Sequence, residues 1–237
     1  MRTSAGRTSP RFRCKTNGMS DLKTKTGAVV PGYLAERAGA SGAVIVIHEY
    51  WGLTDQIRSV ADRFASEGFT AFAVDLYNGI TTTNGERAGE LLSRMSWDEA
   101  LRTVKLAAEA LQTKGYPKLG ITGFCLGGAV ALFAAAKLPA TFQAVIPFYG
   151  IPPEDKADLG ELKARVQGHF ANTDDWITPE RVTSLAKTLE RSKVDAEIHR
   201  YDAKHAFANE ARPEVYSKPD AEAAYARAFA FLRAHLR

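Results

Sequence analysis

Gly123-Phe124-Cys125-Leu126-Gly127-Gly128 is the segment of this sequence that is most informative about its fold. It lies between a run typical of a buried strand, residues 119–123, and a run with helical character, residues 126–137. The pattern Gly-x-Cys-x-Gly matches a nucleophile elbow, a strained strand-to-helix turn, with cysteine at the position where serine is usual. The glycines are needed because a Cβ atom there would clash in so tight a turn. We therefore expect Cys125 to be presented as a nucleophile, and a buried cysteine on a glycine-rich turn is the alternative.

Apolar runs on both sides of the elbow alternate between strand and helix patterns. Strands are predicted at residues 42–48, 70–74, 119–123, 144–149, 165–171 and 196–201. Helices are predicted at residues 54–68, 97–113, 126–137 and 179–191 and at the C-terminus, with a loop rich in Gly, Thr and Asn at 78–85. This alternation is typical of an α/β fold, a mostly parallel central sheet with helices on both faces. Together with the elbow it predicts an α/β-hydrolase fold.

Length and composition are those of one globular domain. The chain has 237 residues, of which 45% are hydrophobic and 24% are charged, so we expect a single large core. No apolar run approaches the roughly 18 residues that a membrane span needs. The formal net charge is +4, but residues 1–18 hold five basic residues and no acid, which leaves 26 basic and 27 acidic residues in the rest. We therefore expect neither a nucleic-acid partner nor membrane insertion.

The N-terminal stretch has a different character from the rest of the chain. Residues 1–24 are poor in apolar side chains, so we expect a disordered basic arm ahead of one domain at residues 25–237. A transit peptide or an electrostatic tail is the alternative to an over-long N-terminus before Met19. Only Cys14 and Cys125 occur, and Cys14 lies in the arm. A domain with one cysteine has no disulfide framework, which indicates a reducing, cytoplasmic compartment.

A cysteine nucleophile needs a base, and the base needs an acid to orient it. In α/β-hydrolases these follow the nucleophile in the order acid, histidine, each on a loop after a later strand. Of the five histidines only His205 has such a place, and the corresponding acid is Asp175, with Asp174 as competitor. The sequence thus predicts a Cys125–His205–Asp175 triad that cleaves an ester or lactone. A surface histidine is the alternative for His205, and no metal or cofactor site is predicted because His48-Glu49 lacks a second histidine at helical spacing.

Several segments resemble the dienelactone hydrolase family in order and spacing, over about residues 24–237. They are the elbow and residues 48–52 (His-Glu-Tyr-Trp-Gly), 75–77 (Asp-Leu-Tyr), 148–150 (Phe-Tyr-Gly), 175–179 (Asp-x-x-Thr-Pro) and 205–207 (His-Ala-Phe). The resemblance implies a resting thiol that is held by Glu49 and turns toward the histidine when substrate enters. It also implies an oxyanion hole from the backbone N–H groups of Tyr50 and Leu126. A carboxylate that only caps the next turn is the alternative for Glu49.

The chain departs from this family at two positions. The resemblance calls for arginines that hold a substrate carboxylate, and here those positions are Gly79 and Asn209. We therefore expect an ester or lactone other than a dienelactone, unless Arg87, Arg94 or Arg212 supplies the charge. Aromatic residues on the strand-end loops are expected to bind substrate, with plain packing as the alternative; beside Tyr50 they are Trp51, Tyr77, Tyr149, Trp176 and Phe207.

Two further readings stay open. A general carboxylesterase or thioesterase acting on a neutral acyl ester would keep the fold and the triad. A non-catalytic hydrolase fold that only binds a ligand is the third possibility, against which the order of the triad argues. The expected partner is a small-molecule ester or lactone, and the expected state is a monomer or homodimer.

Overall fold

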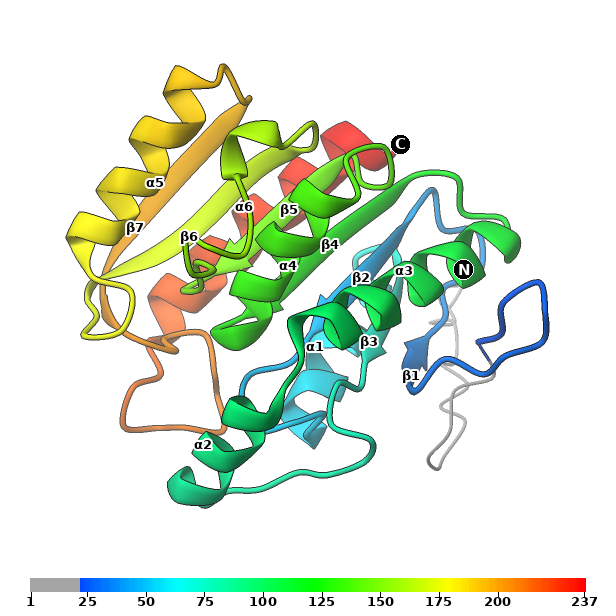
Figure 1. Ribbon diagram of the computed structural model, residues 1–237, viewed down its shortest axis with the longest axis horizontal. Coiled ribbons are helices and arrows are strands. Elements are labelled where there is room, and N and C mark those ends of the chain that lie inside the picture. Colours follow the sequence, from blue (N-terminus) through cyan, green and yellow to red (C-terminus); the bar gives the residue numbers. More distant parts are fainter. Residues whose placement is uncertain (1–21) are drawn as a thin grey trace, which may run out of the picture.

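The structure is a computed structural model that describes residues 22–237 (Figure 1). Its centre is a seven-stranded sheet in the order β1-β3-β2-β4-β5-β6-β7, and β1 alone of these strands runs antiparallel to its neighbour. The strands are β1 (Gly32–Ala35), β2 (Ala43–Ile47), β3 (Thr70–Val74), β4 (Leu119–Phe124), β5 (Ala144–Phe148), β6 (Arg165–Thr173) and β7 (Ala196–Lys204). The predicted mostly parallel sheet is confirmed.

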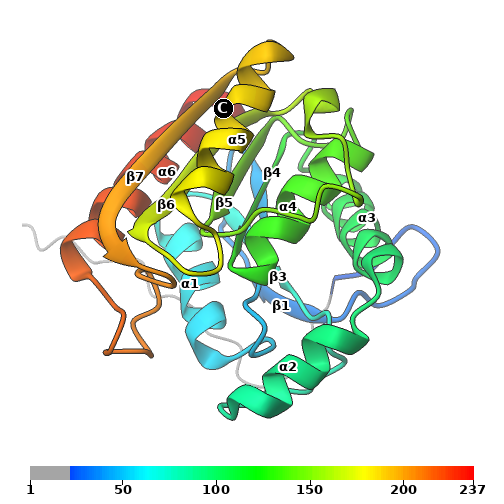
Figure 2. The same cartoon turned by 60° about the vertical axis from the view of Figure 1, so that its left-hand side comes forward.

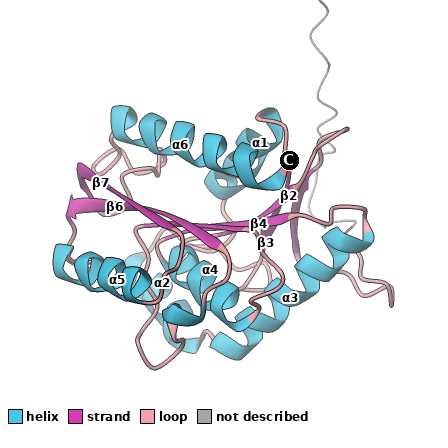
Figure 3. Cartoon of the chain, turned by 90° about the horizontal axis from the view of Figure 1, so that it is seen from above, coloured by secondary structure: helices cyan, strands magenta, loops and turns pink. Residues whose placement is uncertain are grey.

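Helices cover both faces of the sheet, as Figure 3 shows from above. On one face lie α1 (Asp55–Ser66) and α6 (Lys218–Leu236). On the other lie α2 (Gly85–Arg94), α3 (Trp97–Thr113), α4 (Leu126–Lys137) and α5 (Pro179–Arg191), and a 3₁₀ turn spans Leu159–Glu161. Figure 2 shows α5 and α6 on opposite sides of the β6–β7 edge. Among the described residues, no helix combines the length and the apolar character of a bilayer span.

The strand β2 illustrates why the sheet needs two helical layers. All five of its residues are fully buried. Ile45 and Ile47 pack into the core beneath α3 and α4, whereas Val44 and Val46 pack into the core beneath α1 and α6. A strand that buries both faces requires a continuous β-branched run, and that is what predicted it.

Two elements and several boundaries differ from the sequence prediction; β6 and β7, for example, extend beyond the predicted ends at residues 171 and 201. The strand β1 is short and half-buried, and the helix α2 buries only Ala88 and Leu91; no element was predicted at either place. The side chain of Asn84 caps α2 by accepting a hydrogen bond from Arg87 N. At the N-terminus, Leu22 is buried in the core, so the packed part of the chain begins before residue 25, the predicted start of the domain. The rest of the predicted arm, residues 1–21, lies outside the described residues.

At β2 the order in which the chain adds strands to the sheet changes direction. From β2 the chain passes through α1 to β3 on one side, and then through α3 to β4 on the other side. Ligands of such sheets bind beyond the carboxyl ends of the strands at this switch point. Cys125 and Glu49 follow the two strands that meet there.

Candidate active site

Cys125 occupies a strained turn between β4 and α4. Its backbone angles are φ 53° and ψ −115°, and residues other than glycine rarely adopt a positive φ. Its N–H donates to the Phe148 carbonyl at 3.0 Å, which fixes the turn to the end of β5. Cys125 is also the N-cap residue of α4, so its side chain stands at the positive end of the helix dipole. The predicted elbow geometry is present.

The glycines of the elbow allow backbone to touch backbone. A Cβ atom on Gly123 would lie 2.1 Å from the Gly127 carbonyl oxygen, and one on Gly127 would lie 2.2 Å from the Ile47 carbonyl oxygen. Neither neighbour is a side chain that could turn away. The first turn of α4 is therefore pressed directly against the end of β2.

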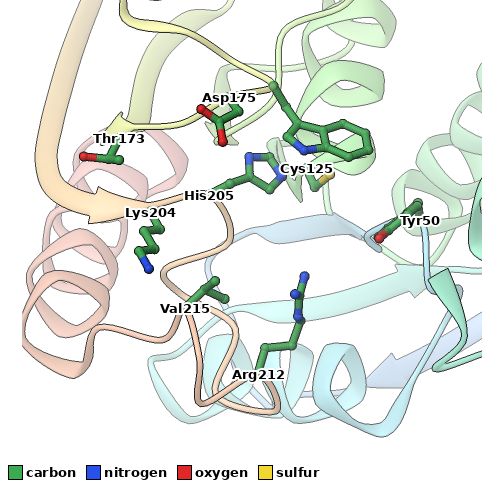
Figure 4. A pocket seen from close by; sticks show the side chains of 9 residues that line it. Tyr50, Cys125, Thr173, Asp175, Lys204, His205, Arg212 and Val215 are labelled. Atoms are coloured by element: carbon green, nitrogen blue, oxygen red, sulfur yellow. The ribbon is translucent and has the colours of Figure 1, made fainter.

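His205 follows β7 and is held by an aspartate. Its Nδ1 lies 2.7 Å from Oδ2 of Asp174, whose side chain is fully buried. Its Nε2 is buried without a well-formed hydrogen bond in residues 22–237, and the ring lies beside Cys125 (Figure 4). Burial alone would lower the pKa of His205, but the bond to Asp174 and the charge of Cys125 outweigh it and raise the pKa to about 10. The charged imidazolium is thus favoured at neutral pH.

The carboxylate that contacts His205 is Asp174, and the prediction of Asp175 for this contact is wrong. The strand β6 continues to Thr173, with an irregularity after Ala171, so Asp174 is the first residue of the loop. Its Oδ1 accepts from the N–H groups of Trp176 and Ile177, both at 2.9 Å, and Asp175 is left exposed. Burial would raise the pKa of Asp174, but these bonds and the one from His205 keep it below the ordinary value.

Glu49 is a buried carboxylate with two donors. Tyr149 donates its hydroxyl to Oε1 at 3.2 Å, and Asn209 donates Nδ2 to Oε2 at 2.7 Å. Burial raises the pKa of Glu49, and the two bonds and the charges of His205 and Arg212 offset only part of this effect. In the described part of the chain its side-chain partners do not include Cys125, so the contact with a resting thiol that the resemblance implies is not formed.

A pocket of about 370 Å³ opens beside Cys125 and His205 (Figure 4). Two cations, Lys204 and Arg212, belong to its wall. The remaining lining residues are Tyr50, Thr173, Asp175, Trp176 and Val215. No group of three or more potential metal ligands is found within residues 22–237.

The aromatic residues predicted to bind substrate divide into two groups. Trp176 lines the pocket, is 60% exposed and stacks with the ring of His205 at 6.1 Å. Trp51 does not line the pocket itself but packs against the lining residue Tyr50, with 4.2 Å between the ring centres. The other three are buried and do not line the pocket: Tyr77, Tyr149 and Phe207. The hydroxyl of Tyr77 is buried without a partner in the described chain.

Arg212 is the one of the three candidate arginines that reaches the pocket. Glu214 accepts from its Nε at 2.7 Å, and its guanidinium lies 5.4 Å from the centre of the Trp51 ring. Arg87 instead pairs with Glu90 on α2. The sequence could not select Arg212, because its place depends on how the loop between β7 and α6 folds back over the strand ends.

Comparisons with known proteins identify the family of this chain. The dienelactone hydrolase family model matches residues 30–236. A relative from Aquifex aeolicus, provisionally named a carboxymethylenebutenolidase, is 35% identical over an alignment that covers 90% of this chain and 96% of the relative. Protein usf of Aquifex pyrophilus is 36% identical with the same coverage. A crystal structure from Klebsiella pneumoniae, provisionally named a dienelactone hydrolase, has a TM-score of 0.78 at 28% identity and covers 90% of this chain and 96% of its own. The chain belongs to the dienelactone hydrolase family and is a hydrolase of ester or lactone bonds.

Proposed function

We propose that Cys125, His205 and Asp174 hydrolyse an ester or lactone through a thioester acyl-enzyme. The observation that carries this proposal is the place of His205, between the buried Asp174 carboxylate and the cysteine at the elbow. A charged imidazole beside a sulfur at a helix N-terminus favours the thiolate, which is the nucleophilic form.

In the first half of the reaction, the Cys125 thiolate attacks the carbonyl carbon of the substrate. A carbon–sulfur bond forms, and the carbonyl electron pair moves to the oxygen, which the N–H groups of Tyr50 and Leu126 stabilise. The tetrahedral intermediate then expels the alkoxide, which takes the proton from His205. With a lactone, the alcohol and the thioester remain parts of one molecule.

In the second half, water replaces the alcohol. His205, now neutral, accepts a proton from a water molecule while the water oxygen attacks the thioester carbon. The carbon–sulfur bond then breaks, and the sulfur leaves as thiolate beside the imidazole, which is charged again. Asp174 keeps the ring in one orientation and stabilises its charge in both halves. The products are the carboxylic acid and the alcohol, and the enzyme returns to its starting protonation state.

The pocket supports a substrate with an aromatic or unsaturated body and an acidic group. Trp176 and Tyr50 line the pocket with aromatic rings, and the cations Lys204 and Arg212 outnumber Asp175, the one acid among its lining residues. A carboxylate on the substrate can therefore be held even though Gly79 and Asn209 occupy the positions of the family arginines. We propose that the carboxylate of Glu49, buried beneath this site, balances the positive charge of His205 while the Cys125 thiolate forms and then reacts with the substrate.

The test is turnover of a panel of aryl esters and lactones by wild-type protein and by Cys125→Ala. We expect the alanine variant to fold normally and to fall below about a thousandth of wild-type turnover, because the covalent step has no other nucleophile. Cys125→Ser should also be weak, because a hydroxyl does not ionise beside His205. Residual activity of the alanine variant above that level would overturn the assignment, and a fully active serine variant would contradict the thiolate mechanism.

A further inference from the structure

His48 is a fully buried side chain that connects two strand ends beside the elbow. It follows β2 directly and makes hydrogen bonds with both ring nitrogens. Its Nδ1 lies 2.5 Å from the carbonyl oxygen of Glu49, and its Nε2 lies 3.1 Å from the backbone nitrogen of Leu76, just after β3. The proposed chemistry does not use this ring.

The partners of His48 determine which nitrogen carries the proton. A backbone N–H can only donate, so Nε2 accepts from Leu76 and is unprotonated. Nδ1 then carries the proton and donates it to the Glu49 carbonyl, which can only accept. Burial is the main influence on the pKa of His48 and lowers it, against smaller opposing effects of the Glu49 carbonyl and Asp75, so the neutral ring is favoured.

The bond to the Glu49 carbonyl also orients the next amide. The described chain has no cis peptide bond, so the Glu49 C=O and the Tyr50 N–H lie in one plane and point in opposite directions. Gly52 N–H donates to the same carbonyl at 3.2 Å and holds it from a second side. Within residues 22–237 the Tyr50 N–H itself donates to no other group. Holding the Glu49 carbonyl in place therefore also fixes the direction of the Tyr50 N–H, a donor that is not otherwise used.

The peptide just before this one, between His48 and Glu49, lies against the first turn of α4. A Cβ atom on Gly127 would be 2.7 Å from the His48 carbonyl oxygen, so the backbone at the end of β2 touches the helix that begins at Leu126. We propose that His48 is a positioning residue, which holds the Glu49 carbonyl so that the Tyr50 N–H points with the Leu126 N–H at the developing oxyanion. This role rests on the proposed function and adds to it a residue outside the triad.

Two substitutions separate the two bonds of His48. An asparagine amide has about the reach of Nδ1, so His48→Asn keeps the donor to the Glu49 carbonyl and loses the acceptor for Leu76 N–H. A glutamine amide has about the reach of Nε2, so His48→Gln keeps the acceptor and loses the donor. Both variants remain polar and uncharged, which makes each the matched control of the other.

The readout is the affinity for an alkyl trifluoromethyl ketone, to whose carbonyl Cys125 adds and leaves an oxyanion. We expect His48→Gln to lose about tenfold in this affinity and in kcat with little change in KM, less than the loss of a whole oxyanion donor. His48→Asn should stay within about threefold of wild type. Alkylation of Cys125 by iodoacetamide forms no oxyanion, and its rate should change in neither variant.

Several outcomes overturn this role. They are an asparagine variant that loses as much ketone affinity as the glutamine variant, a glutamine variant with wild-type affinity, or a loss that extends equally to alkylation. If neither variant folds, ¹⁵N shifts of wild-type His48 decide: a neutral ring protonated at Nδ1 supports the role, and any other form contradicts it. A wild-type protein that is alkylated but neither cleaves esters nor binds the ketone overturns the proposed function as well, whereas an effect absent only from the variants overturns the role of His48 alone.

Discussion

Asp174 and Asp175 are adjacent carboxylates of which one faces inward and one faces solvent. The sequence could place an acid on this loop, because its distance from the elbow and from His205 fits the order of the triad. It could not decide between the two, because a shift of one residue in a strand end reverses the direction of every side chain. The irregularity near the end of β6 produced such a shift.

The two aspartates therefore form a matched pair for mutation. We expect Asp174→Asn to lower kcat on the order of a thousandfold, since an amide neither fixes the imidazole tautomer nor stabilises its charge. The same substitution should lower the pKa of His205, measured by NMR titration. Asp175→Asn removes an exposed charge and should leave kcat within about threefold of wild type. Equal losses in both variants would contradict the role of Asp174.

Arg212 makes a second prediction at the scale of one residue. Its guanidinium is held over Trp51 by Glu214 and faces the pocket. We expect Arg212→Gln to raise KM for a carboxylated lactone about tenfold, the scale of losing one charged hydrogen bond, with little change in kcat. The matched neutral lactone serves as control and should be unaffected. A KM that rises equally for both lactones would show that Arg212 shapes the pocket and does not recognise charge.

The elements are where sequence reasoning succeeded best. The helices α3, α4 and α5 begin and end at the predicted residues, and the strands β2, β3 and β4 at or within a residue of them. In each case a continuous apolar run or a clear helical period coincides with a turn or capping signal. The strand β1 was missed because a half-buried strand of four residues carries little apolar period. The helix α2 was missed although both of its signals are present in the sequence, since Ala88 and Leu91 follow helical spacing and Asn84 is a capping residue.

The junction between β2 and α4 gives the prediction at this scale. We expect Gly127→Ala to lower both stability and turnover, because its methyl group would meet the Ile47 carbonyl and force the elbow away from β2. Gly89→Ala in α2 is the control, since its Cβ would meet nothing within 4 Å. A glycine in a helix costs about 0.5–1 kcal/mol relative to alanine, so the control should raise the melting temperature. A Gly127→Ala protein with wild-type melting temperature and turnover would contradict the close packing.

At the scale of the whole molecule, the site buries charge that the fold must stabilise. Glu49 lies beneath the triad with a raised pKa, and its main cause is burial. The folded protein therefore holds this proton at pH values where the unfolded chain, with a pKa near 4.5, has released it. Ionised Glu49 consequently opposes folding, and its cost to the free energy of unfolding grows as pH rises from about 4.5 through the folded pKa. Such a cost is consistent with a carboxylate retained for catalysis.

Glu49→Gln should therefore trade activity for stability. Its amide can still accept from Asn209 and donate to the Tyr149 hydroxyl, so the buried bonds survive while the charge is removed. We expect a larger free energy of unfolding than wild type at neutral pH, a difference that shrinks as pH falls toward about 4.5, and turnover lower on the order of a hundredfold. Glu109→Gln, on the exposed face of α3, changes the same formal charge and should show neither effect. Denaturant unfolding across pH measures the stability effect, and turnover together with the rate of Cys125 alkylation measures the effect on activity.

A stability difference that does not vary with pH would contradict the buried ionised carboxylate. Turnover and alkylation within about a factor of two of wild type, under 0.5 kcal/mol, would mean that Glu49 serves the structure alone, because a carboxylate that takes part in the charge changes of Cys125 and His205 cannot be neutralised without altering both rates.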